Sequence, residues 1–259
     1  MRKITDSEID FFDQNGYVIC KDVLHEEELV NFQTGSSRLI EEILAGGPAD
    51  AKCGRGPEGI PYYLSYLHST QNDFSLRLLA HPFIGDLLTR MVGPDFIHCY
   101  EALVFKLPGN GSSVPWHGDG DPEEGDERIF NIDIYPDRST VDNSCVWVVP
   151  GSHMWAPNEA NKMVARGKEQ FDLPGAVPAE VKPGDVLLHH TRVLHGSTVN
   201  GPSAGTKSTD GSMIPSSRNV RSFISTHFTY ASRTPMTQMT RHSRSKFPKV
   251  CLPGCRGIR

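Results

Sequence analysis

The chain has 259 residues and a mass of 28.7 kDa; 37% of the residues are apolar, 22% are charged, and the mean hydropathy is −0.37. The net charge of −5 and the pI near 6.1 give no reason to expect nucleic acid or an anionic membrane as a partner. No run of about 18 apolar residues is present, so we expect no transmembrane helix. The opening MRKITDSEIDFF carries charges where a signal peptide needs an apolar segment, which favours a cytoplasmic protein.

The first 95 residues predict mainly helices. Thr5-Asp6-Ser7-Glu8 has the form of a capping box, and the helix that it starts is expected to stop at Asn15-Gly16. The further elements expected in this part are a buried strand over 17–20, a helix over 25–45 that Gly35 weakens, a loop over 46–61, and helices over 74–80 and 84–92.

From about residue 97 the pattern changes to short apolar or alternating runs bounded by turn residues. These runs predict strands over 97–107, 114–116, 129–135, 146–149, 177–181, 186–190 and 220–229. Seven short strands with turn punctuation favour a β-sandwich or jelly roll, with the N-terminal helices packed on one sheet. We expect a single domain over 1–259: a helical part over about 1–95, a core over about 96–232 and a basic tail over 233–259.

The six cysteines are far apart except for Cys251 and Cys255, so we interpret them as free thiols rather than as a zinc site or a disulfide framework.

Among the eleven histidines, His117 has the most informative spacing, because Asp119 follows two residues later. On an extended chain, residues two apart project to the same face, so this imidazole and this carboxylate can converge on one ion. Glycines on both sides of Asp119 leave room for it. A third ligand has to come from elsewhere, and the strand and histidines within 183–197 are the second candidate region.

Two histidines and one carboxylate form the facial arrangement of non-haem Fe(II) oxygenases, and zinc is a poorer match. The open positions on such an iron suit a chelating 2-oxo acid, whose distal carboxylate needs a fixed cation. Arg218 and Arg221 are the candidates, and we favour Arg221 because it lies inside a predicted strand and is costly to bury unpaired.

Several motifs together resemble the phytanoyl-CoA dioxygenase family over about residues 10–232. They are Trp116-His117-Gly118-Asp119, the stretch from Asp142 to Pro150-Gly151-Ser152-His153, Gly184-Asp185, and His195-Gly196-Ser197. The resemblance implies a mainly β fold with flanking α-helices and a double-stranded β-helix (jelly-roll, cupin-like) core. It also implies Fe(II) as the metal, with 2-oxoglutarate and O₂ as co-substrates.

Carried over by position, the resemblance makes His117, Asp119 and His195 the iron ligands. It assigns Arg221 and Ser197 to the distal carboxylate of 2-oxoglutarate. The strand after the first two ligands lines the site in this family, which implies that Asn131 lies beside the cofactor and Asp133 beside the substrate. For Asp133, a solvent-facing or structural role stays open.

The implied reaction is the hydroxylation of an unactivated C–H bond of a small-molecule metabolite, with release of succinate and CO₂. Because Asp119 is retained, hydroxylation is favoured over chlorination. The pocket is expected to be formed by residues 62–68, 120–127 and 198–217, with Trp116 and Tyr62 as further substrate contacts.

Two other functions remain open: a zinc-dependent hydrolase and a non-catalytic jelly-roll binding protein. The pair Arg221 and Ser197 argues against a hydrolase, which needs no clamp for a dicarboxylate. We expect a monomer or a homodimer that binds a small molecule and neither nucleic acid nor a membrane.

Overall fold

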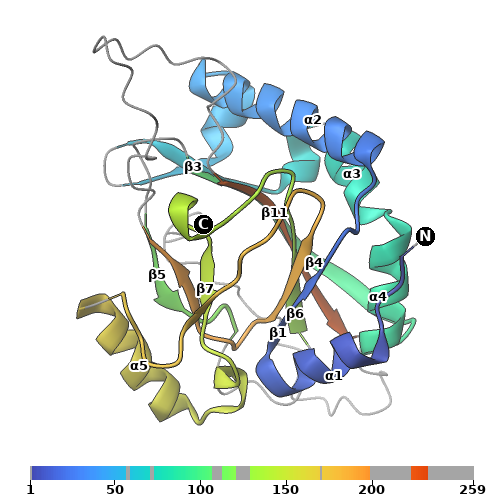
Figure 1. The fold of residues 1–259 in the computed structure, drawn as a ribbon. Coiled ribbons are helices and arrows are strands. Elements are labelled where there is room, and N and C mark those ends of the chain that lie inside the picture. The colour runs from blue at the N-terminus through green and yellow to red at the C-terminus, as the bar shows by residue number, and fades with distance from the viewer. Residues whose placement is uncertain are drawn as a thin grey trace, which may run out of the picture.

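A computed structural model describes residues 2–56, 59–70, 73–106, 113–120, 129–169, 171–198 and 223–232. These residues form helices and two antiparallel β-sheets (Figure 1). The predicted tail 233–259 and most of the predicted loop 198–217 lie outside the described residues.

The larger sheet has seven strands among the described residues, and the smaller sheet has four. In spatial order, the larger sheet consists of β1 (Tyr17–Cys20), β9 (Val186–His190), β6 (Ile129–Ile134), β11 (Phe223–Ser232), β4 (Phe96–Lys106), β3 (Pro61–Ser65) and β2 (Cys53–Arg55). The smaller sheet consists of β5 (Val114–His117), β10 (His195–Ser197), β7 (Val146–Val148) and β8 (Val177–Pro178).

Helices cover the outer face of the larger sheet. They are α1 (Asp6–Asn15), α2 (Glu26–Leu44), α3 (Asp73–Leu79) and α4 (Pro82–Val92). Apolar side chains of β6 such as Phe130 and Ile132 join the core cluster that contains Phe12, Phe32 and Phe83 of these helices. Because side chains alternate along a strand, Asn131 and Asp133 of β6 project from the opposite, inner face. The alternation therefore separates an apolar face for packing from a face that carries polar groups.

The first helix begins and ends as its sequence predicts. The Thr5 hydroxyl accepts a hydrogen bond from the Glu8 N–H at 3.2 Å, and the Glu8 carboxylate accepts one from the Thr5 N–H at 2.9 Å. Gly16 ends the helix with a φ of +76°, a conformation that favours glycine. The predicted capping box is confirmed.

Most predicted elements are present. The strands predicted over 17–20 and 186–190 are β1 and β9, and the runs beginning near 97, 114, 129 and 146 are β4, β5, β6 and β7. The predicted helix over 25–45 is α2. Its Gly35 packs closely against Phe74: a Cβ at this position would lie 2.4 Å from the Phe74 ring. The absence of a side chain at Gly35 permits this contact.

Other predictions were incomplete. The loop predicted over 46–61 contains a 3₁₀ helix and the edge strand β2, which pairs with β3. The strand predicted over 177–181 is reduced to β8 and an isolated bridge between Ser139 and Val181. The strand predicted over 220–229 is observed as β11, whereas residues 220–222 lie outside the described part. The 3₁₀ helices are Pro48–Lys52, Leu67–Thr70, Val141–Asn143 and Ser152–Met154.

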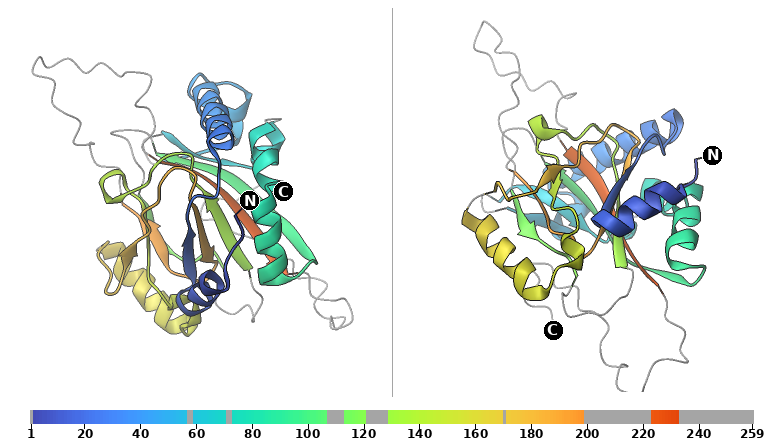
Figure 2. Two further views of the ribbon diagram at one scale, coloured as in Figure 1. Left: turned by 45° about the vertical axis from the view of Figure 1, so that its right-hand side comes forward. Right: turned by 60° about the horizontal axis from the view of Figure 1, so that its bottom comes forward.

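Helix α5 (Pro157–Glu169) was not predicted, because its sequence is polar and contains Gly167. It packs beside the smaller sheet, on the far side of the molecule from α4 (Figure 2). A Cβ at Gly167 would lie 2.6 Å from the Trp116 indole, so this glycine permits the close approach. No described helix has the length and apolar character needed to cross a membrane.

The thiols of Cys20, Cys53 and Cys145 are free, as predicted, and Cys251 and Cys255 lie outside the described residues.

Candidate metal centre

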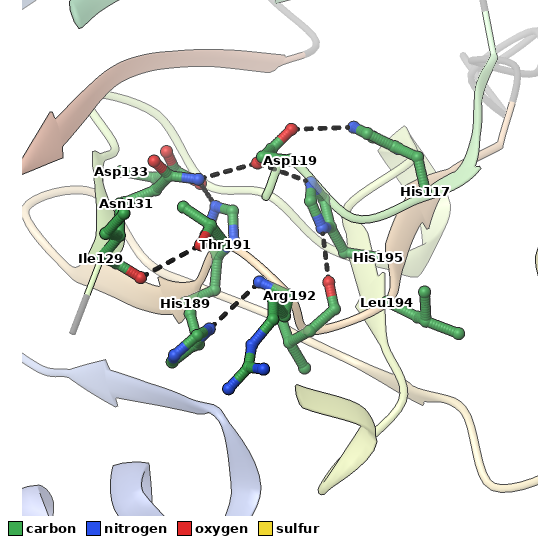
Figure 3. Close-up of polar contacts among 12 residues, drawn as sticks. His117, Asp119, Ile129, Asn131, Asp133, His189, Thr191, Arg192, Leu194 and His195 are labelled. Carbon is green, nitrogen blue, oxygen red and sulfur yellow. Dashed lines mark hydrogen bonds and ion pairs between the residues drawn. The ribbon is translucent and has the colours of Figure 1, made fainter. Parts of the chain in front are cut away.

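His117, Asp119 and His195 converge at one edge of the smaller sheet (Figure 3). His117 ends β5, and its antiparallel neighbour β10 begins with His195 directly opposite it. One potential ligand atom from each of the three residues lies within 4.8 Å of the others. The Asp119 Oδ1 lies 3.3 Å from the His117 Nε2, and the Asp119 Oδ2 lies 3.5 Å from the His195 Nε2.

The backbone of Asp119 is held by Thr191. The Thr191 carbonyl accepts hydrogen bonds from the N–H of Asp119 at 2.6 Å and of Gly120 at 3.0 Å. A Cβ at Gly120 would lie 2.8 Å from the Thr191 hydroxyl, and one at Gly118 would lie 3.3 Å from the Thr191 carbonyl. The two glycines thus let the loop approach Thr191 closely, which is a more specific role than leaving room for an ion.

The protonation of the two imidazoles follows from their backbone partners. The Nδ1 of His117 lies 2.8 Å from the Pro115 carbonyl, and the Nδ1 of His195 lies 3.0 Å from the Val193 carbonyl. A carbonyl oxygen only accepts, so each Nδ1 carries a proton, and a neutral imidazole in this tautomer has its Nε2 lone pair facing Asp119. Burial, with His117 alongside, lowers the pKa of His195 to about 3, so its imidazole stays neutral.

This donor set fits a divalent cation. Two nitrogen lone pairs and a carboxylate face one another, and a positive ion among them satisfies all three. The backbone hydrogen bonds at Nδ1 also orient the rings, as the outer partners of metal-bound histidines commonly do.

Asn131 contacts the centre from the larger sheet. Its side-chain amide donates a hydrogen bond of 2.7 Å to the Oδ2 of Asp119, and the residue is fully buried. The sequence placed Asn131 beside the cofactor, and the structure places it against the carboxylate of a candidate metal ligand.

Asp133 forms a buried pair with His189. The Asp133 Oδ2 lies 3.3 Å from the His189 Nε2, and the exposed fractions of the two side chains are 6% and 2%. The His189 ring centroid lies 4.5 Å from that of His195, so this pair borders the candidate centre. Asp133 is therefore not solvent-facing.

A buried lysine lies beside the predicted Ser197. The Lys106 Nζ donates hydrogen bonds to the Ser197 Oγ at 2.7 Å and to the Thr198 carbonyl at 2.5 Å. Burial lowers the pKa of Lys106 to about 7. The sequence analysis missed this residue; the available signal was a lysine at the end of a predicted apolar strand.

A family profile described as phytanoyl-CoA dioxygenase (PhyH) matches residues 12–205, well over half of the chain. The chain belongs to the phytanoyl-CoA dioxygenase family. It is similar to the methylphosphonate hydroxylase of Gimesia maris, with 26% identity over 202 residues that cover 76% of this chain and 75% of the relative. As a member of this family, the protein is an iron- and 2-oxoglutarate-dependent dioxygenase.

Solved structures agree with the fold of the family. The chain resembles EvdMO1 with a TM-score of 0.70 and 24% identity, covering 88% of this chain and half the length of that one. It resembles EctD from S. alaskensis, solved with 2-oxoglutarate and 5-hydroxyectoine, with a TM-score of 0.66 and 21% identity, covering 88% of this chain and 76% of that one. These likenesses support a cupin-like arrangement of the two sheets.

Two of the remaining predicted site residues, Trp116 and Tyr62, are among the described residues. Arg221 and Arg218 lie outside the described residues, as do residues 121–128. Trp116 is buried on the opposite face of β5 from His117, where its indole N–H donates to the Phe171 carbonyl at 2.6 Å. Tyr62 projects from the face of β3 opposite to Tyr63, with their ring centroids 6.2 Å apart. The structure thus gives Trp116 a packing role.

A cavity of about 200 Å³ lies beside the centre, next to His117. Its lining includes Gly118, Gly120, His153 and Arg192.

Proposed function

We propose that this protein uses Fe(II), 2-oxoglutarate and O₂ to hydroxylate an unactivated C–H bond of a small-molecule metabolite, with release of succinate and CO₂. The observation that carries the proposal is the convergence of the His117 and His195 Nε2 lone pairs on the Asp119 carboxylate. Two imidazoles and one carboxylate are the protein ligands of non-haem Fe(II) oxygenases. The jelly-roll core and the single-domain organisation are part of this proposal.

In this proposal His117, Asp119 and His195 hold the iron, which supplies the activation of O₂. The neutral His195 needs no deprotonation before it binds a metal, because its pKa of about 3 is far below neutral pH. The carboxylate of Asp119 supplies a negative charge that offsets part of the charge of the ion.

Lys106 and Ser197 are proposed to bind the distal carboxylate of 2-oxoglutarate, together with Arg221. An ammonium and a hydroxyl that already contact each other provide donors for one carboxylate. Ser197 follows His195 by two residues on β10, so metal and co-substrate sites share one strand. This buried lysine also argues against the zinc hydrolase, which needs no clamp for a dicarboxylate. The complete set of metal ligands argues against a non-catalytic binding protein.

The substrate is proposed to be a small molecule. The related methylphosphonate hydroxylase carries such a substrate in its name, and EctD was solved with 5-hydroxyectoine.

The test is anaerobic loading with Fe(II), addition of 2-oxoglutarate, and measurement of succinate after O₂ is admitted, with and without a panel that includes methylphosphonate and ectoine. We expect succinate formation that depends on Fe(II) and increases with a substrate. A chain loaded with Zn(II) provides the control and should release no succinate. The proposal is contradicted if the protein binds metal but no 2-oxoglutarate. It is also contradicted if the Zn(II)-loaded protein hydrolyses a compound of the panel.

A further inference from the structure

We propose that Asn131 is a positioning residue that fixes the carboxylate of Asp119 and thereby sets the affinity of the centre for its metal. The inference rests on the proposed function, since it assumes that Asp119 is a ligand. It assigns Asn131 a role that acts through Asp119 rather than through contact with a co-substrate.

The location of Asn131 makes it a rigid support. It lies in β6, where it pairs with His189 of β9 on one side and with Thr229 of β11 on the other. The residue is fully buried, and strands on both sides hold its backbone. A side chain on such a strand is held more tightly than one on a loop.

The hydrogen bond distinguishes the two oxygens of Asp119. The Asn131 amide donates to Oδ2 at 2.7 Å, whereas Oδ1 lies beside His117. A hydrogen bond to an ionised acceptor is shorter and stronger than a neutral one. Rotation of the carboxylate about its Cβ–Cγ bond breaks this hydrogen bond, so Asn131 fixes the plane of the carboxylate relative to both imidazoles.

Asp119 needs such support because the segment of chain that carries it restricts its position only weakly. It lies beyond the end of β5, between Gly118 and Gly120, and glycine restricts the backbone least of all residues. By contrast, His117 and His195 lie on paired strands. The carboxylate is therefore the ligand whose geometry depends most on contacts from outside.

The strand β6 supplies a second contact, to the backbone. The Ile129 carbonyl accepts hydrogen bonds from the Thr191 N–H and from the Thr191 hydroxyl, both at 3.2 Å. Thr191 in turn accepts from the Asp119 N–H. Two residues of β6 thus fix Asp119. Ile129 holds its backbone through Thr191, and Asn131 holds its carboxylate directly.

The experiment compares metal binding by the full chain and two variants, without 2-oxoglutarate or substrate. Asn131→Leu keeps the branched shape and the number of side-chain heavy atoms and removes the donor. Asn143→Ala is the control, because Asn143 also makes side-chain hydrogen bonds, to Arg138 and Thr140, in a turn apart from the centre. Titration with Co(II), followed by its visible absorption, reports both the dissociation constant and the ligand geometry.

We expect Asn131→Leu to weaken Co(II) binding by roughly 10- to 100-fold, as is typical when an outer partner of a ligand is lost, and to alter the absorption spectrum. Asn143→Ala should leave both unchanged even if it lowers the melting temperature. Thermal unfolding of each metal-free variant separates a folding defect from a binding defect. If Asn131→Leu proves too unstable, Asn131→Ser serves in its place, with the same expected direction.

The outcomes separate the two proposals. Tight Co(II) binding with an unchanged spectrum in a folded Asn131→Leu variant overturns the inference and leaves the proposed function intact. If the His195→Ala variant binds Co(II) as tightly as the wild-type protein does, both proposals are overturned.

Discussion

Lys106 and Ser197 join the two sheets: the Lys106 Nζ at the end of β4 lies 2.7 Å from the Ser197 Oγ at the end of β10. The ammonium is buried, although a buried charge is costly. A ligand carboxylate at this point would add a charge-assisted hydrogen bond to those that the ammonium makes with Ser197 and Thr198. The desolvation of Lys106 is therefore a cost to the free protein, and binding of a carboxylate offsets part of it.

Replacement of Lys106 by methionine should weaken 2-oxoglutarate binding. Loss of a hydrogen bond to a charged group costs about 1.5–3 kcal/mol, which corresponds to roughly 10- to 100-fold in the dissociation constant. Titration of the Mn(II)-loaded protein with 2-oxoglutarate measures the effect. Lys162→Met, on the exposed surface of α5, is the control and should bind normally. Equal affinities in the two variants would remove Lys106 from the co-substrate site.

The affinity for 2-oxoglutarate should depend on pH. The pKa of Lys106 is lowered to about 7 by burial, so the amine of the free protein loses its charge as the pH rises through neutrality. A carboxylate binds the charged form, and the affinity therefore falls with rising pH. Lys106→Arg should abolish this inflection, because a guanidinium stays protonated. A pH-independent dissociation constant in the wild-type protein contradicts the assignment.

Lys106→Met should also stabilise the metal-free protein against unfolding at low pH. The pKa of Lys106 is about 7 in the folded chain and 10.5 in the reference state, so the unfolded chain binds more protons between these values. Wild-type stability therefore gains from this lysine as the pH rises from about 7 to 10.5, and the full cost of burial is present below pH 7. At pH 6 we expect Lys106→Met to raise the free energy of unfolding by roughly 1–4 kcal/mol. Urea unfolding at pH 6 and pH 9 checks this, and the gain must shrink at the higher pH.

Removal of a candidate ligand should abolish metal binding at the centre. His117→Ala leaves one nitrogen lone pair and Asp119, so we expect the affinity for Fe(II) to fall by more than about 100-fold, which exceeds the effect of losing an outer partner. Succinate formation should fall with it. His25→Ala, an exposed histidine that precedes α2, is the matched control. Retained metal affinity in His117→Ala shows that the metal binds elsewhere.

Gly120→Ala should disturb the centre without touching a ligand. Its Cβ would lie 2.8 Å from the Thr191 hydroxyl, so the segment that carries Asp119 has to shift. We expect a loss of metal affinity of about tenfold, since ligand geometry tolerates only small displacements. Gly85→Ala is the control: nothing lies within 4 Å of its Cβ, and an alanine inside α4 should stabilise the helix by about 0.5–1 kcal/mol. Normal metal affinity in Gly120→Ala shows that the loop adapts.

Features encoded by neighbouring residues were predictable. The capping box at Thr5, the bounds of β1 and β9, and the spacing of His117 and Asp119 all depend on interactions within a few residues of the chain. These features can be predicted from the sequence because capping and side-chain alternation depend on residues that are close together in the chain. The family motifs added the third member of the triad, His195, which no local spacing identified.

Contacts between distant segments were decided only by the tertiary structure. Nothing near Lys106 in the sequence indicates that it meets Ser197, 91 residues away, and nothing near Asn131 indicates that it holds Asp119 from another sheet. Helix α5 was likewise missed, because its stability comes from packing on Trp116 rather than from its own polar sequence. Strand register and the stacking of two sheets determine which side chains share one interior, and these depend on the path of the whole chain.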